Sequence, residues 1–259
     1  MQGNIVGVSV SGEVIHGKKL GRTLGVPTAN IAFESKEVSP GVYACNIMVL
    51  GGIYFGVGTY QSEKKLFEVF IFDFTQDIYG KNIEIILLEK LRDNKKFENF
   101  EALKVQIHRD IKTSKELQFP VLTFGSFDIL HEGHTYYLTQ AKKYARSLIT
   151  IIARDKTIEH IKGKTPYYHE KLRTEAIKEL GISDIVELGD AHNPYVWFER
   201  YKPKIIALGY DQRGKFVEIL PEKLKEAGLK DTRIIRIESL EPEKYKSSLL
   251  RGVLKKENP

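Results

Sequence analysis

The chain has 259 residues, which is long for one hydrophobic core and short for three, so its length favours two domains of ordinary size. Apolar residues make up 42% of the chain and charged residues 29%, and no apolar run approaches the roughly 18 residues of a membrane span, so we expect no membrane partner. The 40 lysines and arginines against 34 aspartates and glutamates give a net charge of +6, which suits phosphate-bearing small molecules and is too little to indicate a nucleic-acid partner.

The residues from Met1 to Val8 lack a basic segment followed by a long apolar stretch. We therefore expect no secretory signal and a cytoplasmic protein. The one cysteine, Cys45, cannot form an internal disulfide and cannot build a zinc site by itself. It is expected to be a small core residue of a strand.

The first part of the chain carries short β-rich runs between glycine and proline residues, a pattern typical of antiparallel strands. The expected strands are 5–15, 42–50, 53–60, 66–74 and 82–91. Residues 97–113 place apolar side chains, from Phe100 onward, near helical spacing. Together these elements predict a small antiparallel barrel or sandwich that is closed by one helix.

After the polar stretch 112–118 the pattern changes to alternating strands and helices. The expected strands are 121–124, 148–153, 185–188, 205–209 and 234–237. The segments between them are amphipathic and long enough for crossover helices, which predicts an α/β domain with a doubly wound parallel sheet. We place the boundary near residues 116–119, which gives domains 1–116 and 119–259.

The most specific motif of the second domain is TFGSFDILHEGH at 123–134, directly after its first expected strand. A strand that leads through a glycine turn into a helix start leaves backbone N–H groups free to face a polyphosphate. His131 and His134 lie three apart around Gly133, so both imidazoles can reach one side of the turn. A single histidine at a helix start is more often a cap or a surface residue, but the whole segment favours a phosphate site.

This segment resembles the HxGH signature of the nucleotidyltransferase superfamily, and the resemblance covers most of residues 120–252. This half looks most like archaeal-type FAD synthase and, more distantly, like glycerol-3-phosphate cytidylyltransferase. The shared segments are IARD at 152–155, KGK at 162–164, Arg173, LGYDQ at 208–212 and SSLLR at 247–251. The resemblance implies a Rossmann-like fold and a reaction in which an acceptor phosphate attacks the α-phosphorus of a nucleotide and pyrophosphate leaves.

The same resemblance implies the roles of individual residues. His131 and His134 would contact the triphosphate and stabilise the transition state, and Asp211 would lie near the nucleoside. Lys164 and Arg173 would neutralise phosphates, although a solvated basic loop and a solvated helix face explain these two residues equally well when each is taken alone. The full nucleotide-binding set that it implies is Ser126, Phe127, His131, His134, Lys164, Arg173, Asp211, Ser247, Ser248 and Arg251.

The first domain carries the segment PTAN at 27–30. Thr28 and Asn30 lie two apart, so in an extended segment both side-chain oxygens point the same way. Oxygen ligands of this kind suit Mg²⁺, which keeps phosphate oxygens and waters in its remaining positions. From spacing alone, a turn that uses threonine and asparagine for local capping is the favoured alternative.

Residues 10–112 look like riboflavin kinase of the bacterial and eukaryotic type. The segments that carry this resemblance are PTAN at 27–30, PGVY at 40–43, EVFIFDF at 68–74, DIYGK at 77–81 and LRDNKKF at 91–97. The resemblance implies a six-stranded antiparallel barrel with a closing helix. It also implies Mg²⁺ on Thr28 and Asn30, ATP on Gly17, Arg22, Thr28 and Tyr79, and flavin beside Arg92, Lys95 and Phe97.

By this resemblance Glu68 would be the base that takes the proton of the ribityl 5′-hydroxyl, since a hydroxyl is a poor nucleophile at neutral pH. An exposed strand glutamate is the alternative. The chain departs from the family in two places near this residue. Residues 56–62 form a shortened version of the loop before the catalytic strand, and Phe70 stands where the family often has histidine.

Both halves indicate one pathway, from riboflavin to FMN in the barrel and from FMN to FAD in the second domain. The implied partners are the small molecules riboflavin, FMN and ATP, with Mg²⁺ as cofactor and FMN and FAD as substrate or product. Two alternatives stay open. The second domain could serve another phosphorylated acceptor, such as glycerol 3-phosphate with CTP, and the barrel could be a non-catalytic flavin-binding module. The oligomeric state is not indicated by the sequence.

Overall fold

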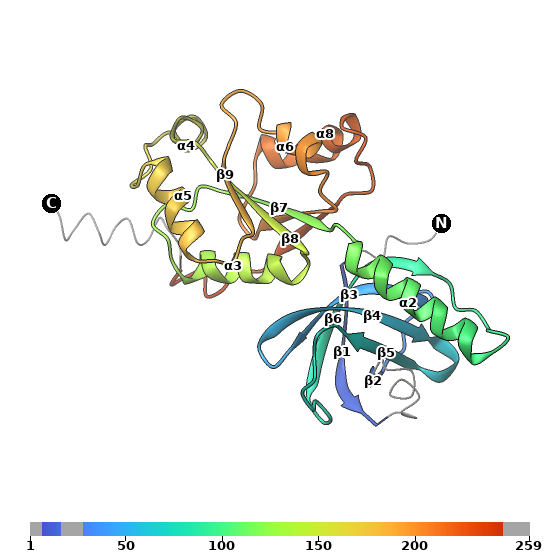
Figure 1. Cartoon of the computed structure of the whole chain (residues 1–259). Helices are drawn as coiled ribbons and strands as arrows, with labels where there is room; N and C mark the ends of the chain where they lie inside the picture. Colours follow the sequence, from blue (N-terminus) through green and yellow to red (C-terminus); the bar gives the residue numbers. More distant parts are fainter. Residues whose placement is uncertain (1–6, 17–27, 246–259) are drawn as a thin grey trace. The chain divides into compact units, whose positions relative to one another are not determined.

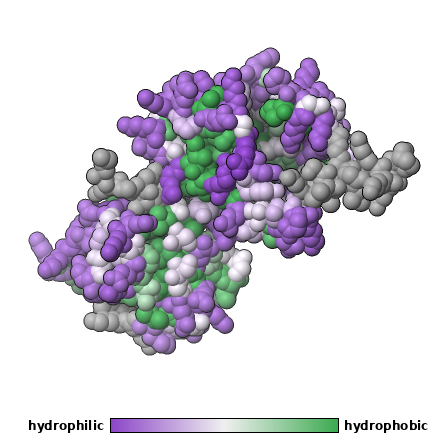
Figure 2. Space-filling view, turned by 180° about the vertical axis from the view of Figure 1, so that it is seen from behind, coloured by the Kyte–Doolittle hydropathy of each residue, from purple (hydrophilic) through white to green (hydrophobic). Residues whose placement is uncertain are grey.

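A computed structural model describes residues 7–16 and 28–245 of the chain (Figure 1). The chain divides into two compact units, Met1–Gln118 and Phe119–Pro259. None of the helices within the described ranges has the length and the apolar character that crossing a membrane requires. On the face shown in Figure 2, each unit presents hydrophilic side chains around smaller areas of hydrophobic surface.

The first unit is a closed barrel of six antiparallel strands, as expected. Its strands are β1 (Val8–Ile15), β2 (Thr28–Ala32), β3 (Gly41–Val49), β4 (Gly52–Gln61), β5 (Leu66–Ile71) and β6 (Asn82–Arg92), in the barrel order β1-β2-β5-β4-β3-β6. Because side chains alternate along a strand, Phe67 and Val69 of β5 lie in the core while Glu68 and Phe70 lie on the other face. Cys45 is buried in β3.

Strand β2 is the element that periodicity alone did not predict. It pairs with β1 on one side and with β5 on the other. Ala29 and Ile31 belong to the barrel core, so Thr28 and Asn30 lie on the opposite face of the strand. A strand this short, with two small polar residues, has a weak hydrophobic pattern, and its two neighbours in the barrel determine its conformation.

The shortened loop expected at 56–62 is mostly strand. Residues 56–61 pair with β5 as the end of β4, and the short 3₁₀ turn η1 (Ser62–Lys64) joins the two strands. A Cβ atom on Gly58 would lie 2.3 Å from the Phe67 ring, and one on Gly56 would lie 2.5 Å from the Phe70 carbonyl oxygen. These glycines allow close packing inside the hairpin, so the loop expectation was wrong.

Helix α2 (Phe100–Glu116) follows the barrel and begins after Asn99, whose side chain accepts a hydrogen bond from the Ala102 N–H. Its fully buried residues are polar, Asp110 and Ser114, and the Ser114 hydroxyl donates to the Gly56 carbonyl at 2.9 Å. Phe100, expected on the apolar face, is 47% exposed. The helix is therefore attached to the barrel in part through satisfied polar contacts.

The second unit is a five-stranded parallel sheet with helices, which confirms the expected α/β fold. Its strands are β7 (Pro120–Gly125), β8 (Ser147–Ile152), β9 (Ile185–Leu188), β10 (Ile205–Gly209) and β11 (Arg233–Ile237), in the order β11-β10-β7-β8-β9. The chain builds outward from β7 through β8 to β9 and then returns to the other side of β7. The winding therefore reverses between β7 and β10, where open α/β sheets form a binding crevice at the carboxyl ends of the strands.

Helices cover both faces of this sheet, with α3 and α5 on one face and α6 and α8 on the other (Figure 1). The helices are α3 (Glu132–Lys143), α4 (Asp155–Lys162), α5 (Glu170–Glu179), α6 (Val196–Tyr201), α7 (Lys215–Glu218) and α8 (Leu220–Glu226). Phe198 and Leu224 pack with Ile149 and Ile206 of the sheet in one core cluster. On the other face, the Tyr137 hydroxyl of α3 donates to the Ala207 carbonyl at 2.7 Å.

Candidate active sites

The turn between β7 and α3 has an unusual backbone. Phe127 and Ile129 have φ angles of +48° and +52°, in the left-handed region that large side chains rarely adopt. Both side chains are buried, and the Asp128 carboxylate between them accepts hydrogen bonds from the N–H groups of Tyr167 and Tyr168 at 2.8 and 3.0 Å. Tertiary contacts thus hold a strained turn, a feature that clusters at functional sites.

Two glycines allow aromatic rings to lie against this turn. A Cβ atom on Gly125 would lie 2.6 Å from the Phe127 ring, and one on Gly133 would lie 3.0 Å from the His131 ring. The Phe127 ring in turn packs edge-on against His134, with 5.3 Å between ring centroids. The glycines of the motif therefore set the positions of its aromatic and histidine side chains.

The structure brings His131 and His134 together. Their rings are stacked, with centroids 3.8 Å apart and planes 18° apart. His131 is the N-cap residue of α3, and its carbonyl accepts the His134 N–H at 2.9 Å. Because residues three apart lie on one side of a helix start, both imidazoles line the same cavity.

Partial burial favours the neutral form of both imidazoles. Desolvation lowers the pKa of His134 to about 3, and positive charge on His131 and Lys162 acts in the same direction. Desolvation also lowers the pKa of His131, against an opposing effect of Asp211. The His134 Nδ1 atom is buried and has no hydrogen-bond partner among the described residues, as expected of an atom that awaits a ligand.

Lys162 is a site residue that the sequence assignment missed. Its ammonium group donates to the Ser126 hydroxyl at 3.1 Å, which places it at the start of the motif turn. Desolvation lowers its pKa, while Asp211 and Asp128 act in the opposite direction. Lys164, which the resemblance singled out, lines the same cavity. The KGK segment at 162–164, which the chain shares with the family, contains both lysines, so this motif could have identified Lys162 as well.

Arg173 does not line the cavity and is only 2% exposed. Its guanidinium donates to the Tyr168 carbonyl at 2.9 Å, to the Ala153 carbonyl at 2.7 Å, to the Asp155 carboxylate at 2.7 Å and to the Ser126 carbonyl. These contacts use most of its donors inside the protein. The structure therefore gives Arg173 a positioning role in place of the expected phosphate contact, and it also excludes the solvated helix face.

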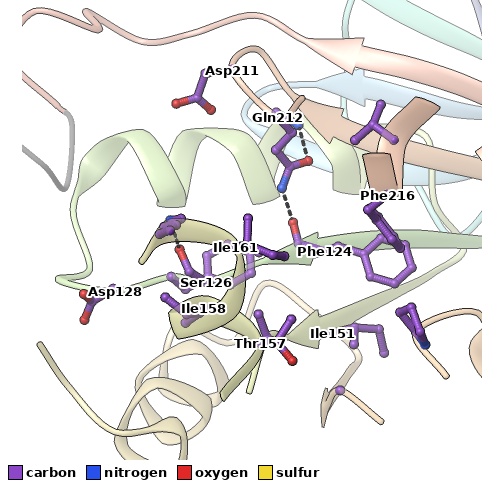
Figure 3. A pocket seen from close by; sticks show the side chains of 18 of the residues that line it. Phe124, Ser126, Asp128, Ile151, Thr157, Ile158, Ile161, Asp211, Gln212 and Phe216 are labelled. Atoms are coloured by element: carbon purple, nitrogen blue, oxygen red, sulfur yellow. Dashed lines mark hydrogen bonds between the residues drawn. The ribbon is translucent and has the colours of Figure 1, made fainter. Parts of the chain in front are cut away.

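The loop after β10 brings Asp211 to the cavity. Gln212 holds this loop, because its side chain accepts the Gly209 N–H at 2.9 Å and donates to the Phe124 carbonyl on β7 (Figure 3). Arg236 of β11 adds a hydrogen bond to the Gly209 carbonyl at 2.6 Å. The carboxyl ends of β7 and β10 are thus linked at the point where the winding of the sheet reverses.

The cavity has a volume of about 920 Å³. The residues of the expected nucleotide-binding set that line it are Ser126, Phe127, His131, His134, Lys164 and Asp211. Ser247, Ser248 and Arg251 lie outside the described residues. The second unit therefore gathers six of the expected residues around one space at the carboxyl edge of its sheet.

The first unit brings Thr28, Asn30 and Glu68 together on the outer face of the barrel. Asn30 is directly opposite Glu68 in the register of β2 and β5, and Thr28 lies two residues away on the same face. The Thr28 hydroxyl donates to the Glu68 carboxylate at 2.5 Å. The Thr28 hydroxyl and the Asn30 amide oxygen are hard-oxygen donors of the kind that Mg²⁺ takes, and the Glu68 carboxylate lies beside them.

Two of the expected ATP-binding residues of the barrel, Gly17 and Arg22, lie outside the described residues. A third, Tyr79, packs against His16 with 4.0 Å between ring centroids. Ile15, which precedes His16, pairs with Asn30. Tyr79 therefore lies at the end of the barrel that carries Thr28 and Asn30.

The expected flavin residues also lie together. The Arg92 guanidinium carbon and the Lys95 ammonium nitrogen are 5.8 and 5.2 Å from the centroid of the Phe97 ring. Arg92 donates from Nε and Nη2 to the buried Asp110 carboxylate of α2, at 2.7 to 3.1 Å. Gln106 accepts a hydrogen bond from Lys95 at 2.8 Å and donates to Asp110 at 2.8 Å.

Asp110 and Gln106 are therefore further site residues that sequence reasoning missed. A buried carboxylate on a largely polar helix leaves little local signal in the sequence, because its ion-pair partner, Arg92, comes from strand β6 and only Gln106 lies on the same helix.

Comparison with known proteins assigns a family to each unit. Residues 6–118 match the family model described as riboflavin kinase, and residues 122–253 match the model described as cytidylyltransferase-like. The bifunctional riboflavin kinase/FMN adenylyltransferase of Haemophilus influenzae is 44% identical over 115 residues, which cover 41% of this chain and 37% of that protein.

Two archaeal proteins named FAD synthase are also similar to the chain. That of Methanohalophilus mahii is 43% identical over 117 residues, covering 45% of this chain and 80% of that protein. That of Archaeoglobus profundus is 41% identical over 128 residues, covering 49% of this chain and 80% of that protein. The chain thus spans little more than a third of the bacterial relative and four fifths of each archaeal one. With residues 122–253 making up more than half of its length, the chain belongs to the cytidylyltransferase-like family, and it carries a riboflavin kinase domain ahead of that part.

Proposed function

We propose that the chain makes FAD from riboflavin in two steps. Residues 1–116 phosphorylate riboflavin to FMN with ATP, and residues 119–259 transfer an adenylyl group from a second ATP to FMN with release of pyrophosphate. The observation that carries the proposal is the stacked, partly buried pair His131 and His134 at the carboxyl end of β7. The names of the relatives support both activities. Since ATP is a cytoplasmic metabolite, we assign the enzyme to the cytoplasm.

In the kinase step, Glu68 takes the proton of the ribityl 5′-hydroxyl. The hydroxyl oxygen then attacks the γ-phosphorus of ATP, and ADP leaves. Thr28 and Asn30 are the residues that would hold Mg²⁺, which when bound neutralises charge on the transferring phosphate. Arg92 and Lys95, whose cationic groups lie 5.8 and 5.2 Å from the centroid of the Phe97 ring, contact the flavin.

In the adenylyl-transfer step, an oxygen of the FMN phosphate attacks the α-phosphorus of ATP. The bond between the α-phosphorus and the bridging oxygen breaks, and pyrophosphate leaves with that oxygen. His131 and His134 donate hydrogen bonds to the charge that develops on the phosphate oxygens, from positions fixed before the substrates bind. Lys162 and Lys164 line the same cavity and neutralise the leaving pyrophosphate.

A flavin conversion assay tests the proposal. The chain is incubated with riboflavin, ATP and Mg²⁺, and the flavins are separated by chromatography over time. We expect FMN to appear first and FAD to follow, and FMN supplied directly with ATP should give FAD and pyrophosphate in equal amounts. Absence of FMN from the first incubation would contradict the kinase assignment. Pyrophosphate release only with glycerol 3-phosphate and CTP would contradict the FAD synthase assignment.

A further inference from the structure

The lining of the cavity in the second unit has two chemically different parts. The polar part includes the histidines, Lys162 and Asp211 described above. The apolar part, which we call the apolar lobe, consists of Ile151, Ile158, Ile161, Tyr195, Trp197 and Phe216. In Figure 3, Ile151 and Phe216 lie across the pocket from Asp128, and Ile158 and Ile161 lie between them, beside Ser126.

The apolar lobe has a flat aromatic wall. Phe216 stacks on Tyr195 with 5.4 Å between ring centroids and 9° between ring planes, and it meets Phe124 edge-on at 5.2 Å. Both Tyr195 and Phe216 are only partly buried, so part of each side chain stays accessible. Burial raises the pKa of Tyr195. Such a wall suits a planar ring that can stack or pack edge-on.

Ile161 forms the rim of the lobe. It lies in the last turn of α4, directly before Lys162, and is 65% exposed, more than any other large apolar side chain in the described part of the chain. Ile158, one turn earlier, is buried. Because Ile161 also lines the cavity, a ligand in the cavity can cover this exposed apolar surface.

The size of the cavity leaves room for a second substrate beside the nucleotide. Its volume of about 920 Å³ lies near the upper end of the range for ligand pockets. The wall around Tyr210, Asp211, Glu238 and Ser239 carries groups that can hydrogen-bond a base and a ribose. The hydrogen-bonding groups of the apolar lobe are the Tyr195 hydroxyl and the Trp197 indole N–H, and its other four side chains are purely apolar, so it suits a ring recognised mainly by its faces.

We propose that the apolar lobe binds the planar aromatic ring of the acceptor, with Ile161 and Phe216 as the side chains that set acceptor specificity. The inference rests on the proposed function, which supplies FMN as that acceptor. The isoalloxazine ring of FMN is flat and apolar along its dimethylbenzene edge, so it can cover Ile161 and lie against Phe216. Glycerol 3-phosphate has no apolar surface and would leave the lobe in water.

The test uses the full chain and measures FAD formation against FMN concentration and, separately, against ATP concentration. In Ile161→Asn and Phe216→Ala we expect the KM for FMN to rise by about tenfold or more, the size of effect that losing one apolar contact has in such a pocket. The KM for ATP should change less than twofold. Leu172→Asn is the matched control, because Leu172 is also exposed but does not line the cavity.

Lumiflavin, the ring without the ribityl phosphate, provides a second measurement. It should inhibit FAD formation competitively with FMN in the wild type, and its inhibition constant should rise in Ile161→Asn. If the wild type makes FAD but neither variant changes the KM for FMN, the lobe assignment is wrong while the proposed function stands. A rise in the KM for ATP alone would assign the lobe to the nucleotide base and overturn the inference. If the wild type makes no FAD from FMN and ATP, the proposed function fails and the inference fails with it.

Discussion

The Thr28 hydroxyl donates a hydrogen bond to the Glu68 carboxylate at 2.5 Å, across the paired strands β2 and β5. The proposed metal ligand and the proposed base of the kinase site are thus in direct contact. The hydrogen bond fixes the orientation of the carboxylate before substrate arrives, because a short strand-to-strand contact leaves little rotational freedom. Both residues can therefore be tested separately and against each other.

Glu68→Gln should lower the rate of riboflavin phosphorylation by about 10²- to 10⁴-fold, the usual contribution of a general base. Conversion of supplied FMN to FAD should stay within twofold, because the second unit has its own core. Chromatographic separation of flavins measures both steps. Glu63→Gln in η1 is the control and should leave both rates unchanged. Loss of both activities in a folded Glu68 variant would contradict the assignment of the two reactions to separate units.

Thr28→Ala should raise the Mg²⁺ concentration needed for half-maximal kinase rate, because it removes a hard-oxygen ligand. Thr28→Ser keeps the hydroxyl and should restore most of the wild-type dependence. The measurement is the initial rate of FMN formation over a Mg²⁺ series at fixed ATP. An unchanged Mg²⁺ dependence in Thr28→Ala would show that this hydroxyl does not bind the metal.

His131→Ala and His134→Ala should each lower the turnover of adenylyl transfer by about 10²- to 10³-fold, as expected for a preorganised donor to developing charge. The KM for ATP should change much less, because the interaction strengthens in the transition state. Pyrophosphate release with FMN and ATP measures both parameters. His108→Ala on α2 is the control. If the replacements raised the KM for ATP and left turnover unchanged, the two imidazoles would only bind substrate.

The lowered pKa of the partly buried His134 predicts a pH-dependent stability of the second unit. Its pKa is about 3 in the folded protein, against about 6.5 in an unfolded chain, so the folded state binds fewer protons between these values. The stability linked to this residue is fully present above about pH 6.5 and is lost as the pH falls toward 3. Between pH 7 and pH 5 the wild type should lose about 2 kcal/mol that His134→Gln does not lose.

Denaturant unfolding followed by tryptophan fluorescence measures this difference, because the chain has one tryptophan and Trp197 lies in the second unit. His108→Gln, which changes an exposed histidine of the first unit, should keep the wild-type pH profile. Parallel pH profiles for the wild type and His134→Gln would contradict the depressed pKa.

Arg173→Lys should reduce the free energy of unfolding of the second unit by about 3 kcal/mol, because a lysine cannot replace the planar fork that meets three carbonyls and Asp155. Adenylyl transfer should fall with it, since Ser126 loses its anchor, while the kinase rate should be unchanged. Unfolding followed by Trp197 fluorescence measures the first effect. Arg200→Lys, at an exposed pair with Glu187, is the control. A fully stable Arg173→Lys with a raised KM for ATP would instead favour direct phosphate contact.

The elements with strong hydrophobic patterns could be predicted from the sequence. The expected strands 185–188 and 205–209 have the bounds of β9 and β10. Strand β2 could not be found this way, because its hydrophobic pattern is weak. Its pairing with β1 and β5 determines its conformation instead. The strand expected at 53–60 matches β4 to within one residue at each end, whereas the loop expected at 56–62 came from the family resemblance and was wrong.

The candidate sites were predictable where a motif is continuous in the chain, as for His131 and His134. They were not predictable where a polar residue is buried by distant partners. Arg173 and Asp110 each satisfy groups that come from other elements, so residue type alone could not separate a ligand contact from an internal one. Lys162 and Lys164 are the same residue type in one short segment. Only the structure shows that Lys162, the last residue of α4, donates to the Ser126 hydroxyl.

The left-handed backbone at Phe127 and Ile129 restricts which substitutions this turn tolerates. Glycine would relax the backbone at either position but would remove the buried side chain that holds the turn in place. Asparagine would also relieve the backbone, yet it would put an amide into an apolar space. Other large apolar residues are the replacements that keep the turn, so redesign of acceptor choice should begin at the exposed rim of the cavity and leave these two positions unchanged.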